Sequence, residues 1–277
     1  MVKFLDDILA AEKRNNTFLC VGLDPDPKLI PKHISEQSDS VFQFCKSIVD
    51  ATHDLVLAFK PQFAYFASQS AEQQLRDLIE YIHLNTEIPV ILDAKRADIA
   101  STSRMYAEEA FKVYGADAVT VNPYFGFDSL QPFLDYKDKG VIILCRTSNP
   151  GGAEIQNIMT AEGSRIFEVV ARKAKAEWNN NGNVLLVAGA THPRELRLIR
   201  DIVSDMTLLI PGIGTQGGEI SAMIENARGG GVIISSSRAV NYASPYTDFA
   251  AAARLAAQNT RDEINTAIYA ICEDIRA

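Results

Sequence analysis

The sequence predicts an α/β protein folded as a single (β/α)₈ TIM barrel, with an extra helix before the first strand. Eight short runs rich in Val, Ile and Leu recur along the 277 residues, and segments long enough for a helix separate them. Such runs are typical of strands covered on both faces, as in a parallel sheet. Eight strand–helix repeats favour a closed barrel over an open doubly wound sheet. No linker or composition break divides the chain, so residues 1–277 are expected to form one catalytic domain.

Each predicted strand is a short run with many β-branched and leucine side chains. The eight runs are Phe18–Asp24, Leu55–Pro61, Pro89–Lys95, Ala118–Asn122, Gly140–Thr147, Asn183–Ala190, Thr207–Ile213 and Gly231–Arg238. Helices are predicted where apolar residues recur at helical spacing or where alanine is frequent. The clearest of these segments are Ala71–His83, Ile166–Trp178, Glu195–Val203 and the tail Phe249–Ile275.

Composition and charge argue against several classes of function. The formal net charge of −8 disfavours nonspecific binding to nucleic acid, which needs a basic face. No apolar stretch approaches the ~18 residues of a membrane span, and the first nine residues carry acids where a signal peptide needs a basic and then an apolar block. The four cysteines, Cys20, Cys45, Cys145 and Cys272, are scattered and suggest no disulfide framework. We therefore expect a soluble, cytoplasmic protein with neither nucleic acid nor a membrane as partner.

Charged side chains stand at the ends of the first three predicted strands, where barrels of this type place their active sites. Asp24 ends the first strand, Lys60 lies at the end of the second, and Asp93, Lys95 and Asp98 end or follow the third. Side chains two residues apart on a strand share a face, so Asp93 and Lys95 should point together into the barrel mouth. A single such pair could be a solvated ion pair. Matching charges on neighbouring strands cost desolvation energy and shift one another's pKa values, which is typical of functional sites.

A phosphate site is predicted after the last two strands. The seventh strand runs into the glycine-rich segment Pro211–Gly218, and the eighth ends at Arg238. Glycines let backbone N–H groups approach phosphate oxygens, Arg238 offers a planar fork, and the Gln216 amide can donate. The segment also matches the dinucleotide fingerprint G-x-G-x-x-G, but the next strand ends in Arg238 and not in an acid for the ribose. A monophosphate site is the better interpretation.

The sequence gives little support for a metal or for a nucleophilic residue. None of the four histidines forms an i, i+4 pair, and His192, which follows the sixth strand, is interpreted as a loop residue. Asp93 and Asp98 could hold Mg²⁺, but Lys60 and Lys95 beside them would repel a cation. No Gly-x-Ser-x-Gly motif is present. We therefore expect neither a metal nor another cofactor.

The hexapeptide Asp93–Asp98, followed by Ile99, resembles the Asp-x-Lys-x-x-Asp-Ile signature of the orotidine 5′-monophosphate decarboxylase family. The similarity is closest to its longer bacterial (type 2) subfamily. Other matching segments are Gly-Leu-Asp24, Phe-Lys60-Pro, Arg146-Thr-Ser-Asn-Pro-Gly, Ala188-Gly-Ala-Thr, Pro211-Gly-Ile-Gly and Arg238. The shorter-chain subfamily commonly has Gly-Arg at the end of strand eight, whereas Ser237 precedes Arg238 here, so the geometry of the phosphate loop is left open.

This resemblance implies the roles of individual residues. Lys60, Asp93 and Lys95 would form an alternating charged chain with Asp98, which a homodimer would donate to the partner's site. Thr102, four residues further on, would also reach across the interface. The implied substrate contacts are Asp24 and Lys60 to the ribose hydroxyls, Ser148 to the pyrimidine amide, and Gln216 and Arg238 to the phosphate. Pro211 is also expected among the substrate-binding residues.

The implied reaction is the cofactor-independent decarboxylation of orotidine 5′-monophosphate to UMP and CO₂, the last step of de novo pyrimidine biosynthesis. Loss of CO₂ from C6 leaves an electron pair in an in-plane orbital, which the ring π system cannot delocalise. The site must therefore stabilise a localised carbanion by electrostatics. The Lys95 ammonium would do this and then supply the proton. Asp93 would lie near the substrate carboxylate and raise its energy, although preorganised stabilisation is expected to contribute more.

Two other functions are compatible with parts of the pattern. Magnesium-dependent sugar-phosphate decarboxylases or aldolases on the same barrel share Asp-x-Lys-x-x-Asp but carry an acid in place of Lys60. A noncatalytic nucleotide-binding barrel would not need closely spaced charges of like sign. Lys60 argues against the first alternative, and the intact charged cluster argues against the second.

Overall fold

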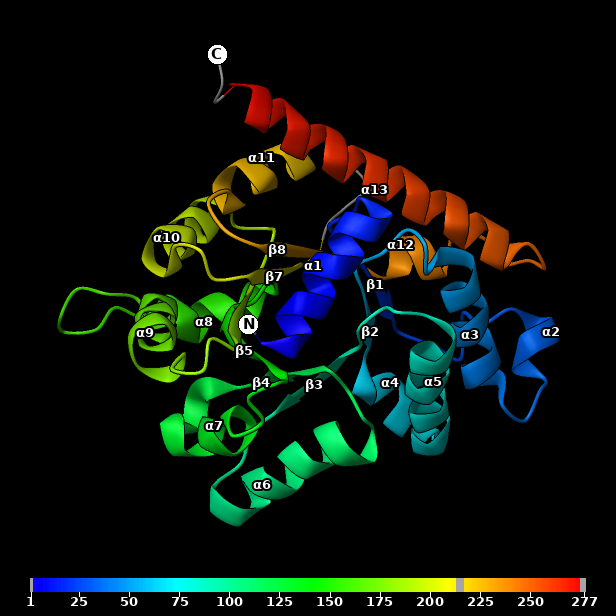
Figure 1. The fold of residues 1–277 in the computed structure, drawn as a ribbon, viewed down its shortest axis with the longest axis horizontal. Helices are drawn as coiled ribbons and strands as arrows, with labels where there is room; N and C mark the ends of the chain where they lie inside the picture. The colour runs from blue at the N-terminus through cyan, green and yellow to red at the C-terminus, as the bar shows by residue number, and fades with distance from the viewer. Residues whose placement is uncertain (1, 213–216, 275–277) are drawn as a thin grey trace.

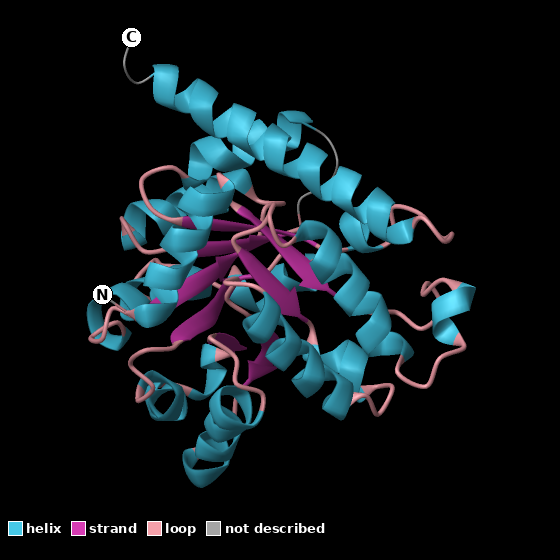
Figure 2. Ribbon diagram, turned by 45° about the vertical axis from the view of Figure 1, so that its right-hand side comes forward, coloured by secondary structure: helices cyan, strands magenta, loops and turns pink. Residues whose placement is uncertain are grey.

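The computed structural model describes residues 2–212 and 217–274, which form a barrel of eight parallel strands with helices around it (Figures 1 and 2). Neighbouring strands follow the order β2-β1-β8-β7-β6-β5-β4-β3, and the paired strands run parallel. The strands are β1 (Leu19–Leu23), β2 (Ala58–Pro61), β3 (Ile91–Arg96), β4 (Ala118–Val121), β5 (Gly140–Arg146), β6 (Val184–Ala188), β7 (Leu208–Pro211) and β8 (Val232–Ser236).

The barrel closes between β2 and β3, the two ends of the strand order. Two isolated bridges join these strands, Phe59 with Val90 and Gln62 with Asp93. The Phe59 N–H donates to the Pro89 carbonyl at 3.1 Å. We call this junction the β2–β3 seam. It differs from the other junctions, where neighbouring strands are paired as ladders, as in the four consecutive pairs between β4 and β5.

Helices occupy the connections between the strands and the two ends of the described chain. The main ones are α1 (Lys3–Asn15), α2 (Lys32–Ser35), α3 (Ser40–Thr52), α4 (Phe63–Ala67), α5 (Glu72–Asn85), α6 (Ala100–Glu108), α7 (Phe127–Leu134), α8 (Ala153–Gln156), α9 (Ile166–Lys173), α10 (Pro193–Val203), α11 (Gly217–Ala227), α12 (Arg238–Asn241) and α13 (Phe249–Asp274). Single π-helical turns continue α6 and α9, namely η1 (Glu109–Val113) and η4 (Ala174–Trp178), and 3₁₀ turns lie at η2 (Pro123–Phe125) and η3 (Pro150–Gly152).

Helix α1 crosses the end of the barrel where the strands begin (Figure 1). The Phe4 N–H donates to the Asp138 carbonyl, and the Phe4 ring fills the space beside Gly140, the first residue of β5. The Asn15 amide donates to carbonyls of His53 and Val56, just before β2. The predicted extra N-terminal helix is therefore confirmed, and it leaves the opposite end of the barrel open for the site.

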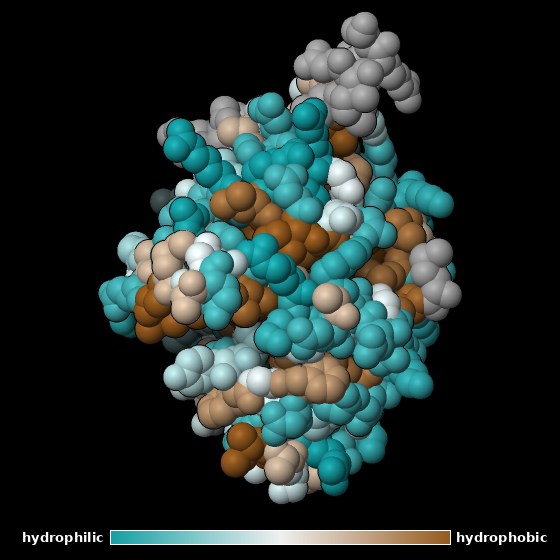
Figure 3. Space-filling view, turned by 90° about the vertical axis from the view of Figure 1, so that its left-hand side faces the viewer, coloured by the Kyte–Doolittle hydropathy of each residue, from teal (hydrophilic) through white to brown (hydrophobic). Residues whose placement is uncertain are grey.

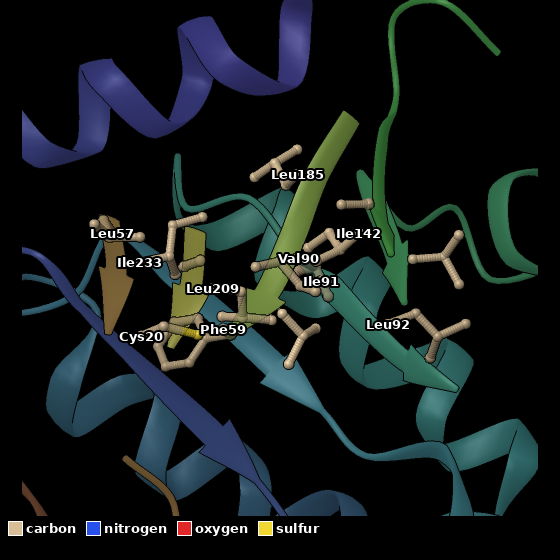
Figure 4. Close-up of a cluster of buried hydrophobic side chains, with 14 of the residues drawn as sticks. Cys20, Leu57, Phe59, Val90, Ile91, Leu92, Ile142, Leu185, Leu209 and Ile233 are labelled. Atoms are coloured by element: carbon tan, nitrogen blue, oxygen red, sulfur yellow. The ribbon is translucent and has the colours of Figure 1, made fainter. Parts of the chain in front are cut away.

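Side chains from different strands fill the barrel interior, as the cluster in Figure 4 shows. Ile142, Leu185, Leu209 and Ile233 come from β5, β6, β7 and β8, and each is at most 2% exposed. Helices cover the outer faces, so the strand residues on both sides of the sheet are buried. This burial explains why the strands are nearly continuous apolar runs in the sequence.

The eight predicted strands are confirmed, and their ends are corrected by up to three residues. Residues 55–57 lie outside β2, which begins at Ala58. The predicted eighth strand extended to Arg238, but β8 ends at Ser236 and Arg238 is the first residue of α12. The backbone turns out of the sheet at Ser237 (φ −121°, ψ −81°). Of the predicted seventh strand, β7 covers Leu208–Pro211, while residue 213 lies outside the described residues.

The four helices predicted by name also form, with small changes at their ends. The first begins at Glu72 and runs to Asn85 as α5, and the second is α9 followed by the π-helical turn η4. The tail forms α13 as far as residue 274. In the part of the chain that the structure describes, no helix combines the length and apolar character needed to cross a membrane.

The surface is mainly polar, with apolar patches between the helices. Figure 3 shows such patches on the side that lies to the left in Figure 1, where α7 to α10 are found. Exposed apolar side chains on these elements and their connections are Phe127, Ile155, Ile158, Met159 and Leu198.

Candidate active site

Three of the predicted charged side chains meet at the open end of the barrel. The Asp93 carboxylate on β3 lies between two ammonium groups: Lys60 Nζ is 3.1 Å from Oδ2, and Lys95 Nζ is 2.7 Å from Oδ1. Lys60 and Asp93 are buried, whereas the Lys95 side chain is 46% exposed. Lys95 is therefore the member of this charged cluster that a ligand in the barrel mouth can reach.

A threonine that the sequence did not single out completes the cluster. Thr120, on β4, donates from Oγ1 to Asp93 Oδ1 at 2.8 Å and accepts from the Lys95 N–H at 2.9 Å. It is 1% exposed. The only signal in the sequence is a lone hydroxyl within the apolar run Ala118–Val121, so its role depends on the register between β3 and β4.

The backbone at Lys95 is unusual and helps to aim its side chain. Lys95 has φ +47°, in the left-handed region that few residues other than glycine adopt. The β3–β4 register also shifts between Leu92 and Arg96. The predicted proximity of Asp93 and Lys95 is confirmed, but a local irregularity and not regular strand alternation brings them together. Strained backbone at such a point is common in functional sites.

The charged cluster holds Lys60 and Asp93 in their ionised forms. Burial alone would raise the pKa of Asp93, but Lys60 and Lys95 outweigh burial and hold the pKa well below its ordinary value. Burial would lower the pKa of Lys60, but Asp93 and Asp24 raise it above its ordinary value. Asp93 therefore stays ionised and Lys60 stays protonated across the physiological range.

Asp24 follows β1 and completes the charge pattern on the side of Lys60. Its Oδ1 atom is buried and has no hydrogen-bond partner among the described residues. A buried carboxylate oxygen without a partner is costly unless a ligand or water satisfies it. Asp24 is therefore available to accept hydrogen bonds from a bound molecule.

Asp98 and Thr102 do not join the cluster within the chain. Asp98 Oδ1 accepts from the adjacent Ile99 N–H at 2.7 Å, and the Asp98 carbonyl accepts from the Ser129 hydroxyl of α7. Thr102 is exposed on α6. Within residues 2–212 and 217–274, no ion pair or hydrogen bond connects either side chain to Lys60, Asp93 or Lys95.

Ser148 lies between the ends of β6 and β7. A Cβ on Gly189 would stand 2.9 Å from the Ser148 backbone, and one on Gly212 would stand 3.7 Å from Ser148 Oγ. Thr191 Oγ1 donates to the Ser148 carbonyl at 3.3 Å. The serine is therefore close to the segment after Pro211, where the phosphate contacts were predicted.

A buried arginine supports the segment that carries Ser148. Arg146, at the end of β5, is 2% exposed and forms an ion pair with Glu195 of α10. It also donates to the Thr147 carbonyl at 2.6 Å and to Gln156 Oε1 of α8 at 3.1 Å. Gln156 Oε1 in turn accepts from the Thr147 N–H at 3.0 Å. The sequence offered no sign of the two partners, which lie 10 and 49 residues away.

The predicted phosphate residues are described only in part. Pro211 is the last residue of β7, and Arg238 is exposed at the start of α12. Gln216 lies outside the described residues. The two described residues follow neighbouring strands, since β7 pairs with β8 and Pro211 is aligned with Ser235.

The described residues offer no cluster of side chains suited to a metal. Among the described residues, no three His, Cys, Asp or Glu side chains come close enough to hold one. His192 stands at the N-terminus of α10 with its Nε2 buried and without a partner in the described part of the chain. Asp93 and Asp98, the two carboxylates considered above as Mg²⁺ ligands, bond to other groups. Asp93 bonds to a lysine side chain, and Asp98 bonds to the backbone of the next residue.

Comparisons with known proteins bear on this arrangement. Residues 17–254 match the model of the orotidine 5′-phosphate decarboxylase / HUMPS family. A protein of Ralstonia nicotianae named orotidine 5′-phosphate decarboxylase is 57% identical over 268 residues, which cover 95% of this chain and 98% of the relative. One of the same name from Aromatoleum aromaticum is 56% identical over 266 residues, with 95% and 98% covered.

Solved structures give the same result for the fold. The OMP decarboxylase of Leishmania donovani matches with a TM-score of 0.83 at 37% sequence identity, and 96% of this chain and 99% of that chain are covered. The orotidine 5′-monophosphate decarboxylase of Methanocaldococcus jannaschii, solved with the inhibitor BMP, matches with a TM-score of 0.67 at 22% identity, so this likeness concerns the fold alone. The predicted (β/α)₈ barrel is confirmed.

Proposed function

The chain belongs to the orotidine 5′-phosphate decarboxylase / HUMPS family, and we infer that it decarboxylates orotidine 5′-monophosphate to UMP and CO₂ with Lys95 as the proton donor. This reaction is the last step of de novo pyrimidine biosynthesis. One observation carries the inference: a single carboxylate lies between a buried and an accessible ammonium group at the mouth of the barrel. Lys60 stands where magnesium-dependent sugar-phosphate decarboxylases or aldolases would carry an acid. This lysine therefore supports decarboxylation without a metal.

The chemistry explains why two lysines flank one aspartate. Departure of CO₂ leaves a localised electron pair at C6, and an adjacent ammonium stabilises that charge as it develops. Lys95, the accessible amine, then transfers its proton to C6 and gives UMP. Asp93 orients this ammonium through their ion pair, and Lys60 keeps Asp93 ionised. The amines supply both the charge and the proton, so the proposed reaction needs no cofactor.

The remaining substrate contacts extend from this charged cluster. We assign the ribose hydroxyls to Asp24 and Lys60 and the pyrimidine amide to Ser148. Asp24 Oδ1 has no hydrogen-bond partner in the part of the chain that the structure describes, and this supports the first assignment, since a hydroxyl of the substrate would satisfy it. The phosphate is assigned to Gln216 and Arg238, and Pro211, the last residue of β7, is assigned to the substrate site. Binding energy at the nonreacting phosphate can orient the ring at the reacting carbon.

We propose that the enzyme is a homodimer in which Asp98 and Thr102 complete the partner's site. Both residues are free of the charged cluster in their own chain. Apolar side chains beside them are exposed, with Ile99 at 58% and Met105 at 56%. Exposed apolar surface of this kind marks protein interfaces. A second copy would bury these side chains and bring the Asp98 carboxylate to the opposing Lys95.

Two further assignments concern the chain as a whole. We assign residues 1–277 to one catalytic domain, because the buried apolar residues of the barrel, α1 and α13 belong to one cluster. We place the protein in the cytoplasm, because Cys20, Cys45 and Cys145 are free and buried and suit a reducing compartment.

The activity is tested by following the loss of orotidine 5′-monophosphate absorbance with purified, EDTA-treated protein. Wild-type protein should decarboxylate the substrate after chelation, and Lys95→Ala should lose turnover while UMP still binds. Lys137→Ala, an exposed lysine on the connection before β5, serves as the matched control and should keep full activity. No decline in absorbance with wild-type protein would refute the activity, and near-normal kcat in Lys95→Ala would refute the role of Lys95.

The shared site is tested by mixing two inactive variants. Lys95→Ala and Asp98→Ala proteins, denatured and refolded together, should form mixed dimers in which one site carries both native residues. Activity should then return to about a quarter of the wild-type value, because half of the dimers are mixed and each has one intact site. No recovery in mixtures that demonstrably exchange subunits would place Asp98 in its own site.

A further inference from the structure

The hydroxyl of Tyr242 holds the chain segment that follows β1. Its Oη donates to the Asp24 carbonyl and accepts from the Asp26 N–H, both at 2.6 Å. Burial raises the pKa of this hydroxyl well above its ordinary value, so the proton that it donates remains in place. The backbone of Asp24 is thereby fixed at the residue whose side-chain Oδ1 is buried without a partner among the described residues.

The same tyrosine is tied to α12 and to the core. Its N–H donates to the Arg238 carbonyl at 3.1 Å, so it closes the helix that Arg238 opens. Its ring stacks on Phe44, with ring centres 5.7 Å apart, and Phe44 stacks on Phe249 at 5.5 Å. Tyr242 therefore connects three separate parts of the chain: the end of β1, α12 and the α3–α13 packing.

We propose that Tyr242 is a positioning residue that couples the ribose contact at Asp24 to the phosphate contact at Arg238. The inference rests on the proposed function, which assigns those two contacts. At Asp24 the hydroxyl bonds the backbone carbonyl, so the carboxylate Oδ1, which has no partner among the described residues, stays available to the substrate. The rigid aromatic stack keeps the hydroxyl in place. A nucleotide that contacts both residues gains from having their spacing set before it binds.

The first test is Tyr242→Phe, which keeps the stacked ring and removes the hydroxyl. Loss of two hydrogen bonds of ordinary strength should weaken UMP binding and raise the KM for orotidine 5′-monophosphate about tenfold. kcat should change less, since Lys95 and Asp93 are not touched. Tyr246→Phe, at a residue that is 73% exposed, is the matched control and should behave as wild type.

The second test separates positioning from a general effect on stability. UMP affinity is measured for Tyr242→Phe in the wild-type and Asp24→Ala backgrounds. If the hydroxyl acts through Asp24, removing the hydroxyl should lower UMP affinity less than twofold in the Asp24→Ala background. An equal loss of affinity in both backgrounds would overturn the proposal, as would a Tyr242→Phe enzyme with the wild-type KM and UMP affinity.

Different results would overturn the proposed function and the role of Tyr242. A wild-type protein that neither decarboxylates orotidine 5′-monophosphate nor binds UMP would overturn the proposed function and this inference with it. An active wild-type protein whose Tyr242→Phe variant is unchanged would overturn the coupling role alone.

Discussion

The side chain of Ser237 occupies the space in front of Gly22. A Cβ on Gly22 would overlap Ser237 Oγ and stand 3.0 Å from Ser237 Cβ. Gly22 belongs to β1 and is buried, while Ser237 connects β8 to Arg238 at the start of α12. A glycine on one strand thus makes room for the serine that precedes Arg238. This contact gives a structural reason for glycine at position 22 when residue 237 has a side chain.

Gly22→Ala should therefore displace Ser237 and, with it, Arg238. Rotation of the hydroxyl can relieve the first overlap, but the Cβ contact remains tight, so we expect a loss of ~1–3 kcal/mol in stability and a raised KM. Adding Ser237→Gly to Gly22→Ala should restore most of the lost stability and bring the KM back toward the wild-type value. The measurements are urea unfolding and steady-state kinetics, and a double variant no better than Gly22→Ala would contradict the explanation.

Thr120→Val should impair catalysis through Asp93 and Lys95. The variant removes a hydrogen bond to the Asp93 carboxylate and leaves the Lys95 N–H without its acceptor. An unsatisfied group of this kind costs ~1–3 kcal/mol, so kcat/KM should fall about tenfold or more. Thr120→Ser keeps the hydroxyl and should retain most activity. Equal kinetics for the valine and serine variants would show that the hydroxyl is dispensable.

Arg146→Met should strongly destabilise the protein. The substitution leaves Glu195 without its cation in a largely buried place, and breaking such a pair typically costs ~3–5 kcal/mol. Replacing both partners, as in Arg146→Met/Glu195→Leu, should lower the free energy of unfolding by less than the sum of the losses in the two single variants. Denaturant unfolding of the four proteins measures this coupling. Strict additivity would mean that the ion pair is not the source of the effect.

Asp117 should make stability depend on pH at the acid end. It accepts from His83 Nε2 at 2.8 Å and from the Val90 N–H at 2.9 Å, just before β4. Burial alone would raise its pKa, but His83 and the Val90 N–H lower it below the ordinary value of 3.8. Because folding lowers this pKa, ionised Asp117 adds to the free energy of unfolding. This contribution is complete above the pKa that Asp117 has in the unfolded chain, and it is lost as the pH falls through the pKa in the folded protein.

The measurement is the Tm of Asp117→Asn against wild type between pH 7 and pH 2. The variant should be less stable at pH 7, and the difference should shrink below about pH 4. Asp138→Asn, at an exposed aspartate nearby, is the control and should show little difference at any pH. A constant gap between Asp117→Asn and wild type would show that the charge of Asp117 does not contribute.

The sequence was sufficient for features that depend on local pattern. Apolar runs located all eight strands, since residues covered on both faces must be apolar along the chain. The spacing from Asp93 to Lys95 predicted that the two side chains would meet, and they do, but the left-handed backbone at Lys95 brings them together in place of regular strand alternation. The predicted end of the eighth strand, Arg238, was wrong because nothing in Ser236–Arg238 marks the point at which the backbone leaves the sheet.

Contacts between distant segments could not be predicted in the same way. Thr120, Tyr242 and Glu195 find their partners 25 to 218 residues away, and those contacts depend on strand register and helix packing. The left-handed backbone at Lys95 is also set by tertiary structure, because lysine has no local preference for it. A charge pattern can therefore indicate a site, while the groups that orient it become apparent only in the folded chain.

The β2–β3 seam has a consequence for how variants of the charged cluster are interpreted. Lys60 and Asp93 stand on opposite sides of that seam, where isolated bridges replace a continuous ladder. Their ion pair therefore helps to close the wall of the barrel as well as to set the charge of the site. A variant at either position loses a reactive group and loosens the wall at once, so its inactivity has two inseparable causes. Lys95 bonds to Asp93 of its own strand, so its removal leaves the seam in place, and a loss of activity there reports on the reaction more directly than a loss at Lys60 or Asp93.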